Sequence, residues 1–132
     1  PTLQDNWLCG FVDSEGCFSV SIKRHLKFSI CFDIAQKGTG GLDILNYLNT
    51  LFTVGKVYNH SASGVYYYRI GGLRDLMKLF PYFDNHPLRS KKLKSYILWK
   101  DLHGRLLKKD HLNPTLTDSL KVLASKVNNN WD

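Results

Sequence analysis

The sequence predicts an α+β domain in which a four-stranded antiparallel sheet has helices packed on one face. Two stretches, residues 17–37 and 54–70, alternate between apolar and polar side chains as half-buried strands do. Segments with apolar residues at helical spacing stand before, between and after them. The resulting order, α-β-β-α-β-β-α with further helices behind it, places two hairpins in one layer and the helices in another.

The first elements are a helix and a hairpin. The helix is expected over about residues 7–15, with Asp5 or Asn6 as its cap and Gly16 as a left-handed end. The strands "CFSVSIKRH" and "LKFSICFDIAQK" adjoin with almost no linker, so they predict a hairpin that turns near residues 24–26.

The remaining elements follow from glycine breaks and apolar spacing. The run "GTGG" ends the second strand, "LDILNYLNTLF" predicts a helix, and the second hairpin turns at "SASG". A helix over 73–83 is expected to be interrupted near Pro81. A basic helix of about residues 89–106 and a C-terminal helix of about 114–128, capped by Asn113 and Pro114, complete a single domain of residues 1–132.

Composition narrows the class of partner. Lys and Arg number 18 against 11 Asp and Glu, a net charge of +7, which favours nucleic acid first and an anionic membrane surface second. A basic protein without such a partner is the alternative. No apolar run approaches the length of a membrane span, and no signal peptide opens the sequence. Three cysteines without metal-ligand spacing suggest reduced thiols and an intracellular location.

The face of the sheet turned away from the helices carries cations, hydroxyls, imidazoles and tyrosines, the groups that contact phosphates and base edges. A solvated face is the alternative, since most antiparallel sheets have one. We expect DNA contact from Ser19, Ser21, Lys23, His25, Lys27, Ser29, Cys31, Asp33, Tyr58, His60, Tyr67 and Arg69.

The first helix ends with two acids, Asp13 and Glu15, where unpaired carbonyls already carry partial negative charge. Gly10 and Ser14 lie four residues apart on one face, so a second helix could approach closely. A second copy of the same helix would bring two Glu15 carboxylates together, and a divalent cation would relieve their repulsion.

The stretch "LCGFVDSEG", residues 8–16, resembles the LAGLIDADG motif of homing endonucleases. It has Cys for Ala, Phe for Leu, Val for Ile, Ser for Ala and Glu for Asp. The element order and "PLRSKKL" also agree with that family. The resemblance implies the LAGLIDADG homing endonuclease fold and a site-specific, metal-dependent double-strand cut in DNA.

The resemblance also implies roles for particular residues. Glu15 would bind the metal, with help from the Ser14 carbonyl, and Asp13 is the weaker candidate. Gln36 matches a polar site residue at the end of the second strand, and Lys91 a site lysine, with Lys92 as its alternative. Mg²⁺ suits carboxylate and carbonyl oxygens, and Ca²⁺ or Mn²⁺ could take the same place. Gln36 could orient the attacking water, and the lysine could stabilise the developing charge.

The resemblance implies that two motif helices build one active region, and this sequence contains one such motif. Either the chain forms a homodimer on a palindromic or near-palindromic site, or it pairs with another LAGLIDADG half. A start at Pro1 rather than Met favours a half taken from a longer protein. We expect the interface to contain Leu8, Gly10, Phe11 and Ser14, which would otherwise expose an apolar patch.

Two other functions stay open. The chain could be an RNA maturase that assists intron splicing, or a catalytically silent DNA-binding half domain. Membrane binding is disfavoured, because no basic amphipathic helix exposes aromatic residues. The resemblance points to an intron of an organelle, a mitochondrion or a chloroplast.

Overall fold

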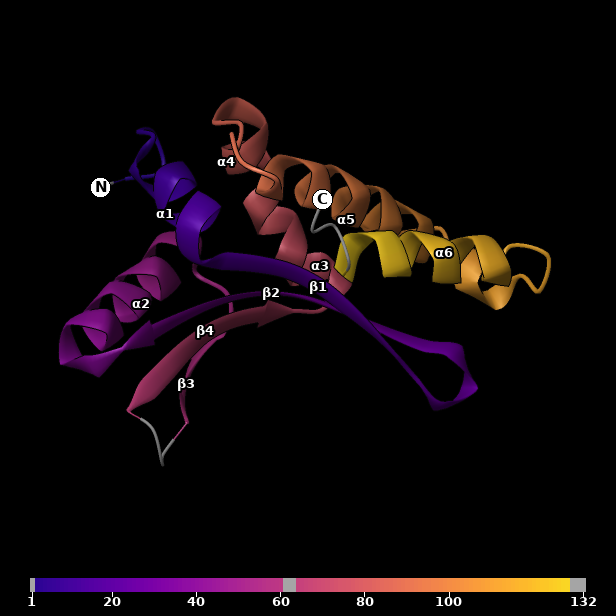
Figure 1. Ribbon diagram of the computed structural model, residues 1–132, viewed down its shortest axis with the longest axis horizontal. Helices are drawn as coiled ribbons and strands as arrows, with labels where there is room; N and C mark the ends of the chain where they lie inside the picture. Colours follow the sequence, from indigo (N-terminus) through magenta and orange to yellow (C-terminus); the bar gives the residue numbers. More distant parts are fainter. Residues whose placement is uncertain (1, 61–63, 129–132) are drawn as a thin grey trace.

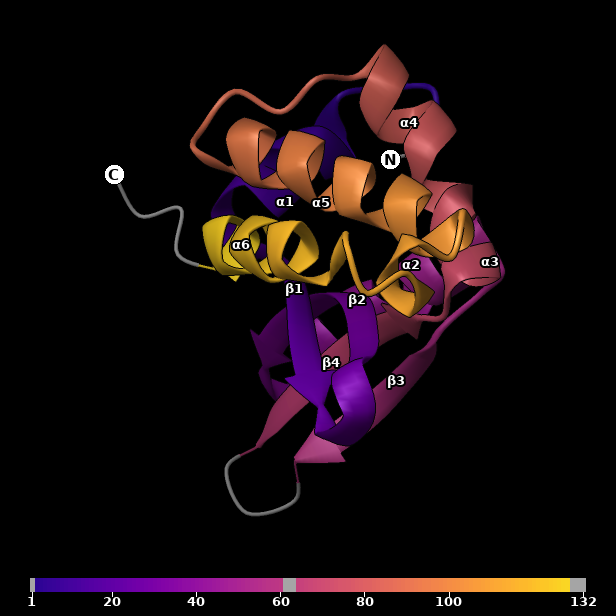
Figure 2. The same cartoon turned by 90° about the vertical axis from the view of Figure 1, so that its right-hand side faces the viewer.

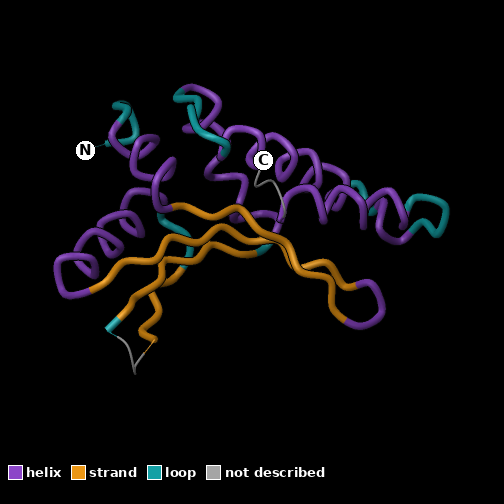
Figure 3. The backbone as a smooth tube through the Cα atoms, in the orientation of Figure 1, coloured by secondary structure: helices purple, strands orange, loops and turns teal. Residues whose placement is uncertain are grey.

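The computed structural model describes residues 2–60 and 64–128 and shows an α+β fold with a sheet below and helices above (Figures 1 and 3). In this orientation the sheet arches, so that its free face is concave and open. The predicted fold class is confirmed, since the helices all lie on one side of the sheet.

Over the described residues, four antiparallel strands form one sheet in the order β1-β2-β4-β3. Their bounds are Gly16–Lys23 (β1), Lys27–Lys37 (β2), Lys56–His60 (β3) and Val65–Gly71 (β4). A 3₁₀ turn, η1 (Arg24–Leu26), joins β1 to β2 where the sequence predicts a turn. The second hairpin agrees in its strands, whereas residues 61–63 of its expected turn "SASG" lie outside the described part.

The helix before β1, α1 (Trp7–Glu15), ends differently from the prediction. Gly16 has φ −78° and ψ 160°, so it is extended and is already the first residue of β1. A side chain here would place its Cβ 2.6 Å from Val12 Cγ1, which is too close. Glycine is therefore needed because the strand leaves the helix without a loop. The Asp5 carboxylate, rather than Asn6, accepts from the Trp7 N–H at 3.1 Å.

The helix between the hairpins, α2 (Gly38–Phe52), begins earlier than predicted. The "GTGG" run forms its first turn instead of a loop, with Gly38 at φ +81°. A Cβ on Gly41 would lie 2.7 Å from Gln36 Cβ, so this turn packs tightly against the end of β2.

The later helices cover the rest of the sheet. They are α3 (Leu73–Leu76), α4 (Phe80–Asn85), α5 (Lys92–Leu107) and α6 (Thr117–Asn128), with 3₁₀ turns at Met77–Leu79 (η2) and Asp110–Leu112 (η3). Figure 2 shows α5 and α6 side by side over the strands. The predicted interruption near Pro81 is confirmed: η2 separates α3 from α4, and Pro81 lies in the first turn of α4, where its missing N–H costs nothing.

Two predicted helix starts are too early. The basic helix begins at Lys92 rather than near residue 89, because Arg89 and Ser90 donate their N–H groups to a side chain of α1. The last helix begins at Thr117 rather than at residue 114, because the Asn113 side chain accepts from the Thr115 N–H, at 3.0 Å, in a turn before it.

The core joins the sheet to the helices through aromatic rings. Phe18 of β1 lies 5.0 Å from Trp99 and 5.3 Å from Tyr96 between ring centroids. Trp99 also donates from Nε1 to the Ser19 carbonyl, and the Asn128 amide exchanges two hydrogen bonds with the backbone of Val20. These bonds tie the edge strand β1 to α5 and α6, which positions it beside the end of α1.

Candidate functional site

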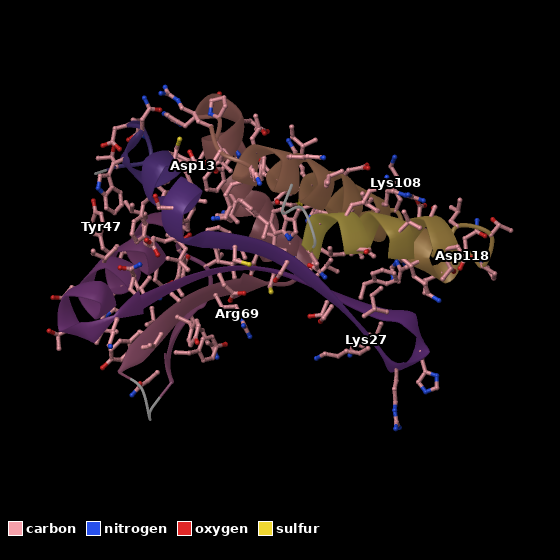
Figure 4. The ribbon with its side chains drawn as sticks, in the orientation of Figure 1. Asp13, Lys27, Tyr47, Arg69, Lys108 and Asp118 are labelled. Carbon is pink, nitrogen blue, oxygen red and sulfur yellow. The ribbon has the colours of Figure 1, made fainter. Side chains whose placement is uncertain are left out.

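The open face of the sheet carries the polar residues that the alternation predicts. Strand pairing sets Ser19 opposite Cys31, Ser21 opposite Ser29, Asp33 opposite Arg69 and Tyr58 opposite Tyr67. Figure 4 shows Lys27 and Arg69 projecting below the sheet, away from the helices. Side chains on one face of a strand recur every second residue, so the register brings these groups onto a single surface.

The sequence interpretation missed Lys56, which belongs to the same face. It pairs with Arg69 and stands two residues before Tyr58. The alternation already contained this signal, because Lys56 and Tyr58 have the same parity in β3.

Two imidazoles expected on this face have different outcomes. His25 is not a strand residue: it lies in η1 with φ 61°, exposed at the tip of the first hairpin. His60 is the last residue of β3, and its side chain lies outside the described part of the structure.

A chain of polar contacts crosses the middle of this face. Arg69 donates from Nε to Asp33 Oδ1 at 2.5 Å, and the Cys31 thiol donates to Asp33 Oδ2 at 3.4 Å. Ser19 Oγ lies 3.2 Å from Cys31 Sγ. Burial raises the pKa of the Cys31 thiol, which therefore stays neutral and adds no negative charge to the face.

The end of α1 lies at the edge of this surface. Ser14 and Glu15 are exposed there, and Glu15 is the last residue of the helix. The Val12 carbonyl accepts from the Gly16 N–H, and the Asp13 carbonyl accepts from Lys92 Nζ at 3.3 Å. The Ser14 carbonyl is the next one along the helix.

Gln36 approaches the same end from β2. Ile34, two residues earlier, pairs with Gly16, the residue that follows Glu15. Gln36 shares the parity of Ile34, so it lies on the helix side of the strand and packs against Gly41 rather than facing the open side. Its Nε2 donates to the Ala35 carbonyl at 2.7 Å.

Asp13 uses its carboxylate inside the protein. It accepts from the N–H groups of Arg89 and Ser90, at 3.0 Å each, and from the Ser90 hydroxyl at 2.7 Å. Burial opposes ionisation, but the bonds from Ser90 and Arg89 and the charge of Lys92 outweigh it and hold the Asp13 pKa below its usual value. The expected catalytic role of Asp13 is therefore difficult to combine with this geometry, which makes it a clamp between α1 and the start of α5.

This clamp borders a hollow of about 460 Å³ between α1, β1, α5 and α6. The structure brings Asp13, Lys91 and Lys92 together there, and the lining also includes Cys17, Phe18, Ser90, Ser95, Val127 and Asn128. Lys92 is the more buried of the two lysines, and its ammonium donates to the Asp13 carbonyl. Lys91 is exposed, so it is the more accessible of the two lysines from solvent.

One of the residues expected at the interface, Leu8, does not lie on the outer face of α1. Leu8 is 0% exposed and belongs to the core, because it lies on the side of the helix that packs on the sheet. Gly10 is exposed, and the rings of Trp7 and Phe11 stack at 5.3 Å. Trp7, which the sequence interpretation missed, is 39% exposed, so the uncovered face consists of Trp7, Gly10 and Ser14, with the half-buried Phe11 at its border.

The donor atoms at the end of α1 are oxygens, which are the ligands that a hard divalent cation prefers. Glu15 offers a carboxylate and Ser14 a backbone carbonyl, the oxygen ligands that Mg²⁺ and Ca²⁺ take. Within the described part of the chain, no three His, Cys, Asp or Glu side chains converge to hold a metal. The donor chemistry fits, but one chain supplies only part of a coordination shell.

The sequence and the fold both match known proteins. Residues 8–103 match the family model described as LAGLIDADG endonuclease. The chain belongs to the LAGLIDADG endonuclease family. The match covers most of α1, the whole sheet and most of α5, whereas α6, which borders the hollow, lies beyond it.

Individual members of the LAGLIDADG family show how much of each protein the chain represents. It is 33% identical over 98 residues to a probable intron-encoded endonuclease, Cox1-I1b, of Schizosaccharomyces pombe, covering 71% of this chain and 25% of that protein. The crystal structure of the meganuclease I-AabMI bound to uncleaved DNA superimposes with a TM-score of 0.86 at 27% identity, covering 94% of this chain and 44% of that one. The homing endonuclease I-TnaI gives 0.83 at 28% identity, covering 91% and 84%.

The chain thus spans between 23% and 39% of the length of these curated relatives. It corresponds to less than half of I-AabMI and to most of I-TnaI. Across the described residues, no helix combines the length and the apolar character needed to cross a membrane.

Proposed function

We propose that this chain is a site-specific DNA endonuclease that makes a metal-dependent double-strand cut as a homodimer on a palindromic or near-palindromic site. One observation carries the proposal: an exposed carboxylate, Glu15, ends a helix whose outer face is uncovered. Two copies joined through that face would bring two such carboxylates together.

The open face of the sheet supports double-stranded DNA as the substrate. Its concave shape (Figure 3) and its lysines, arginine, hydroxyls and tyrosines suit a major groove, which admits a β-ribbon. The net charge of +7 favours attraction to the phosphate backbone. I-AabMI, the neighbour named above, was solved bound to DNA.

The mechanism assigns one task to each side chain. The Glu15 carboxylate and the Ser14 carbonyl of each copy would hold Mg²⁺, with Ca²⁺ or Mn²⁺ able to bind the same donors. A bound Mg²⁺ supplies a Lewis acid for the phosphoryl oxygens and a water of lowered pKa. The Gln36 amide orients the attacking water, and the Lys91 ammonium stabilises charge on the phosphate. Asp13 takes no proton and positions the segment that carries Lys91.

The partner is a second copy or another LAGLIDADG half. The 84% coverage of I-TnaI supports a chain that acts as one of two equal subunits, and the 44% coverage of I-AabMI supports one half of a longer chain. Both arrangements place α1 against a second α1. The names of the relatives, which refer to introns of cox1 and ND4 genes, favour an intron-encoded protein of an organelle.

The test is cleavage of a randomised palindromic duplex library with Mg²⁺ or Ca²⁺. We expect cuts with wild type and Mg²⁺ only, and no cuts with Glu15→Gln, which should still bind the selected site. The matched control is Asp118→Asn, which removes an exposed carboxylate at the far end of the molecule (Figure 4) and should leave cleavage unchanged.

The other outcomes separate the competing functions. Enrichment by binding without cuts would indicate a silent half domain or a chain that needs a different partner. Binding of intron RNA in preference to every duplex would indicate a maturase. Equal loss of binding and cleavage in Glu15→Gln would contradict its assignment as a metal ligand.

A further inference from the structure

Asp33 is an acid in the centre of a surface that otherwise favours a polyanion. Its side chain is only 16% exposed, whereas that of its cross-strand partner Arg69 is 54% exposed. Both carboxylate oxygens accept hydrogen bonds, Oδ1 from Arg69 and Oδ2 from the Cys31 thiol. Asp33 therefore lies low between the strands and holds Arg69, which projects into the open space below the sheet (Figure 4).

The contact fixes one particular part of the guanidinium. Asp33 binds Nε, so the two terminal nitrogens form the outer edge of a planar group. A planar pair of parallel N–H donors matches the O6 and N7 acceptors that guanine presents in the major groove. Because Asp33 is itself held through Cys31 and Ser19, this edge keeps its direction before DNA binds.

The position of the pair in the sheet favours a base over a phosphate. Asp33 and Arg69 belong to β2 and β4, the inner strands, whereas Lys23 and Lys27 flank the hairpin tip at the periphery. A ribbon lying in a groove presents its centre to the base edges and its margins to the phosphates. A phosphate contact also needs no fixed guanidinium orientation, since lysine makes it equally well as a point charge.

We propose that Asp33 and Arg69 form a guanine-reading unit, in which Asp33 binds Nε and the terminal nitrogens of Arg69 donate to O6 and N7 of one guanine. This assignment rests on the proposed function, because it names one base pair of the DNA site that the sheet would recognise. It makes Asp33 a positioning residue for specificity rather than a DNA contact.

The experiment is a binding selection from a randomised duplex library in Ca²⁺, with base preference measured at every position. Wild type should show a position at which guanine is strongly favoured. Arg69→Lys keeps the charge and Asp33→Asn keeps the shape, yet each should reduce the guanine preference at that same position by about 10- to 100-fold. Preferences elsewhere should stay unchanged.

The matched control removes a comparable ion pair from the helix side. Lys100 Nζ lies 2.7 Å from Asp84 Oδ2, and both side chains are exposed. Asp84→Asn should leave the whole preference profile as in wild type. Thermal unfolding shows whether each variant is folded. Arg69→Gln is used in place of a variant that does not fold.

Three results would overturn the assignment. An unchanged guanine preference in Arg69→Lys, together with a uniform loss of affinity across all sequences in Arg69→Gln, would make Arg69 a phosphate contact. Changes at different positions in the two variants would show that they do not act as a unit. If wild type selects a DNA site but no guanine preference in that site depends on Arg69, this inference alone is refuted. If wild type selects no duplex at all, the proposed function is refuted as well.

Discussion

At the scale of single residues, the two acids at the end of α1 have separate tasks. Asp13 points into the protein and satisfies the N–H groups of Arg89 and Ser90, which precede α5. Glu15, two residues later on a helix, points elsewhere and is exposed. The helix period thus separates a structural carboxylate from one that remains available for a metal.

The Asp13 clamp predicts a specific effect of Asp13→Asn. An amide offers one oxygen where the carboxylate offered two, and its NH₂ group would face backbone donors, so we expect a loss of about 1–3 kcal/mol in the free energy of unfolding. Cleavage should fall further than binding, by about 10- to 100-fold, because the segment that carries Lys91 would shift. The Lys91 ammonium would then no longer be held in its position for the phosphate. Urea unfolding and single-turnover cleavage measure the two effects.

The pH dependence of this stabilisation has a definite sign. Because the folded protein lowers the Asp13 pKa, its contribution is complete above the unfolded value, about 3.9, and is lost as pH falls through the lower folded value. The difference between wild type and Asp13→Asn should be constant from pH 7 to 5 and shrink below about pH 4. Asp101→Asn, an exposed acid on α5, is the control. A difference that persists unchanged at pH 2 would contradict the clamp.

At the scale of elements, α1 is a helix with two apolar sides. Leu8, Cys9 and Val12 pack into the core. Trp7 and Phe11 stack on the outer side next to Gly10, where an added Cβ would meet nothing within 4 Å. A helix that is apolar on both sides needs cover on both, and only one side is covered within a single chain.

Gly10→Leu should therefore prevent association. A leucine would hold two α1 helices apart, so we expect monomers or insoluble protein, although the same change should favour the isolated helix by about 1 kcal/mol. Light scattering over a concentration series measures the oligomeric state. Gly104→Leu in α5, another helical glycine with open space at its Cβ, is the control that should leave association unchanged. A wild-type dimer from Gly10→Leu would place the interface elsewhere.

At the scale of the whole molecule, charge and shape act together. The sheet arches with its open face away from the helices (Figures 1 and 4), and Lys23, Lys27, Lys56 and Arg69 belong to that face. Bound to DNA as proposed, a curved surface with this charge would follow the backbone of the duplex and release the cations bound to it.

Affinity for DNA should therefore fall steeply with salt. Each phosphate contact contributes about −0.9 to the slope of log affinity against log salt, so Lys56→Gln should make the slope shallower by about 1. Lys78→Gln, an exposed lysine of η2 in the helix layer, should leave the slope unchanged. Fluorescence anisotropy between 50 and 300 mM salt, roughly the range in which counterion release dominates, measures both. A flat response of wild type would contradict the DNA-facing sheet.

The sequence by itself determined what depends on local periodicity. Alternation over 17–37 and 54–70 determined the strands and which of their side chains share the open face, because parity leaves only two choices. The motif of residues 8–16 determined the family and placed Glu15 at a helix end.

Only the tertiary structure decided what depends on packing between distant segments. Leu8 is buried rather than exposed because α1 lies on the sheet. Asp13 meets Ser90, 77 residues away, and Asp33 meets Arg69 across two inner strands. Gly16 is extended because the strand begins without a loop. Periodicity specifies the face on which a side chain lies, whereas the partner it meets there depends on how the elements pack, and no local pattern encodes that.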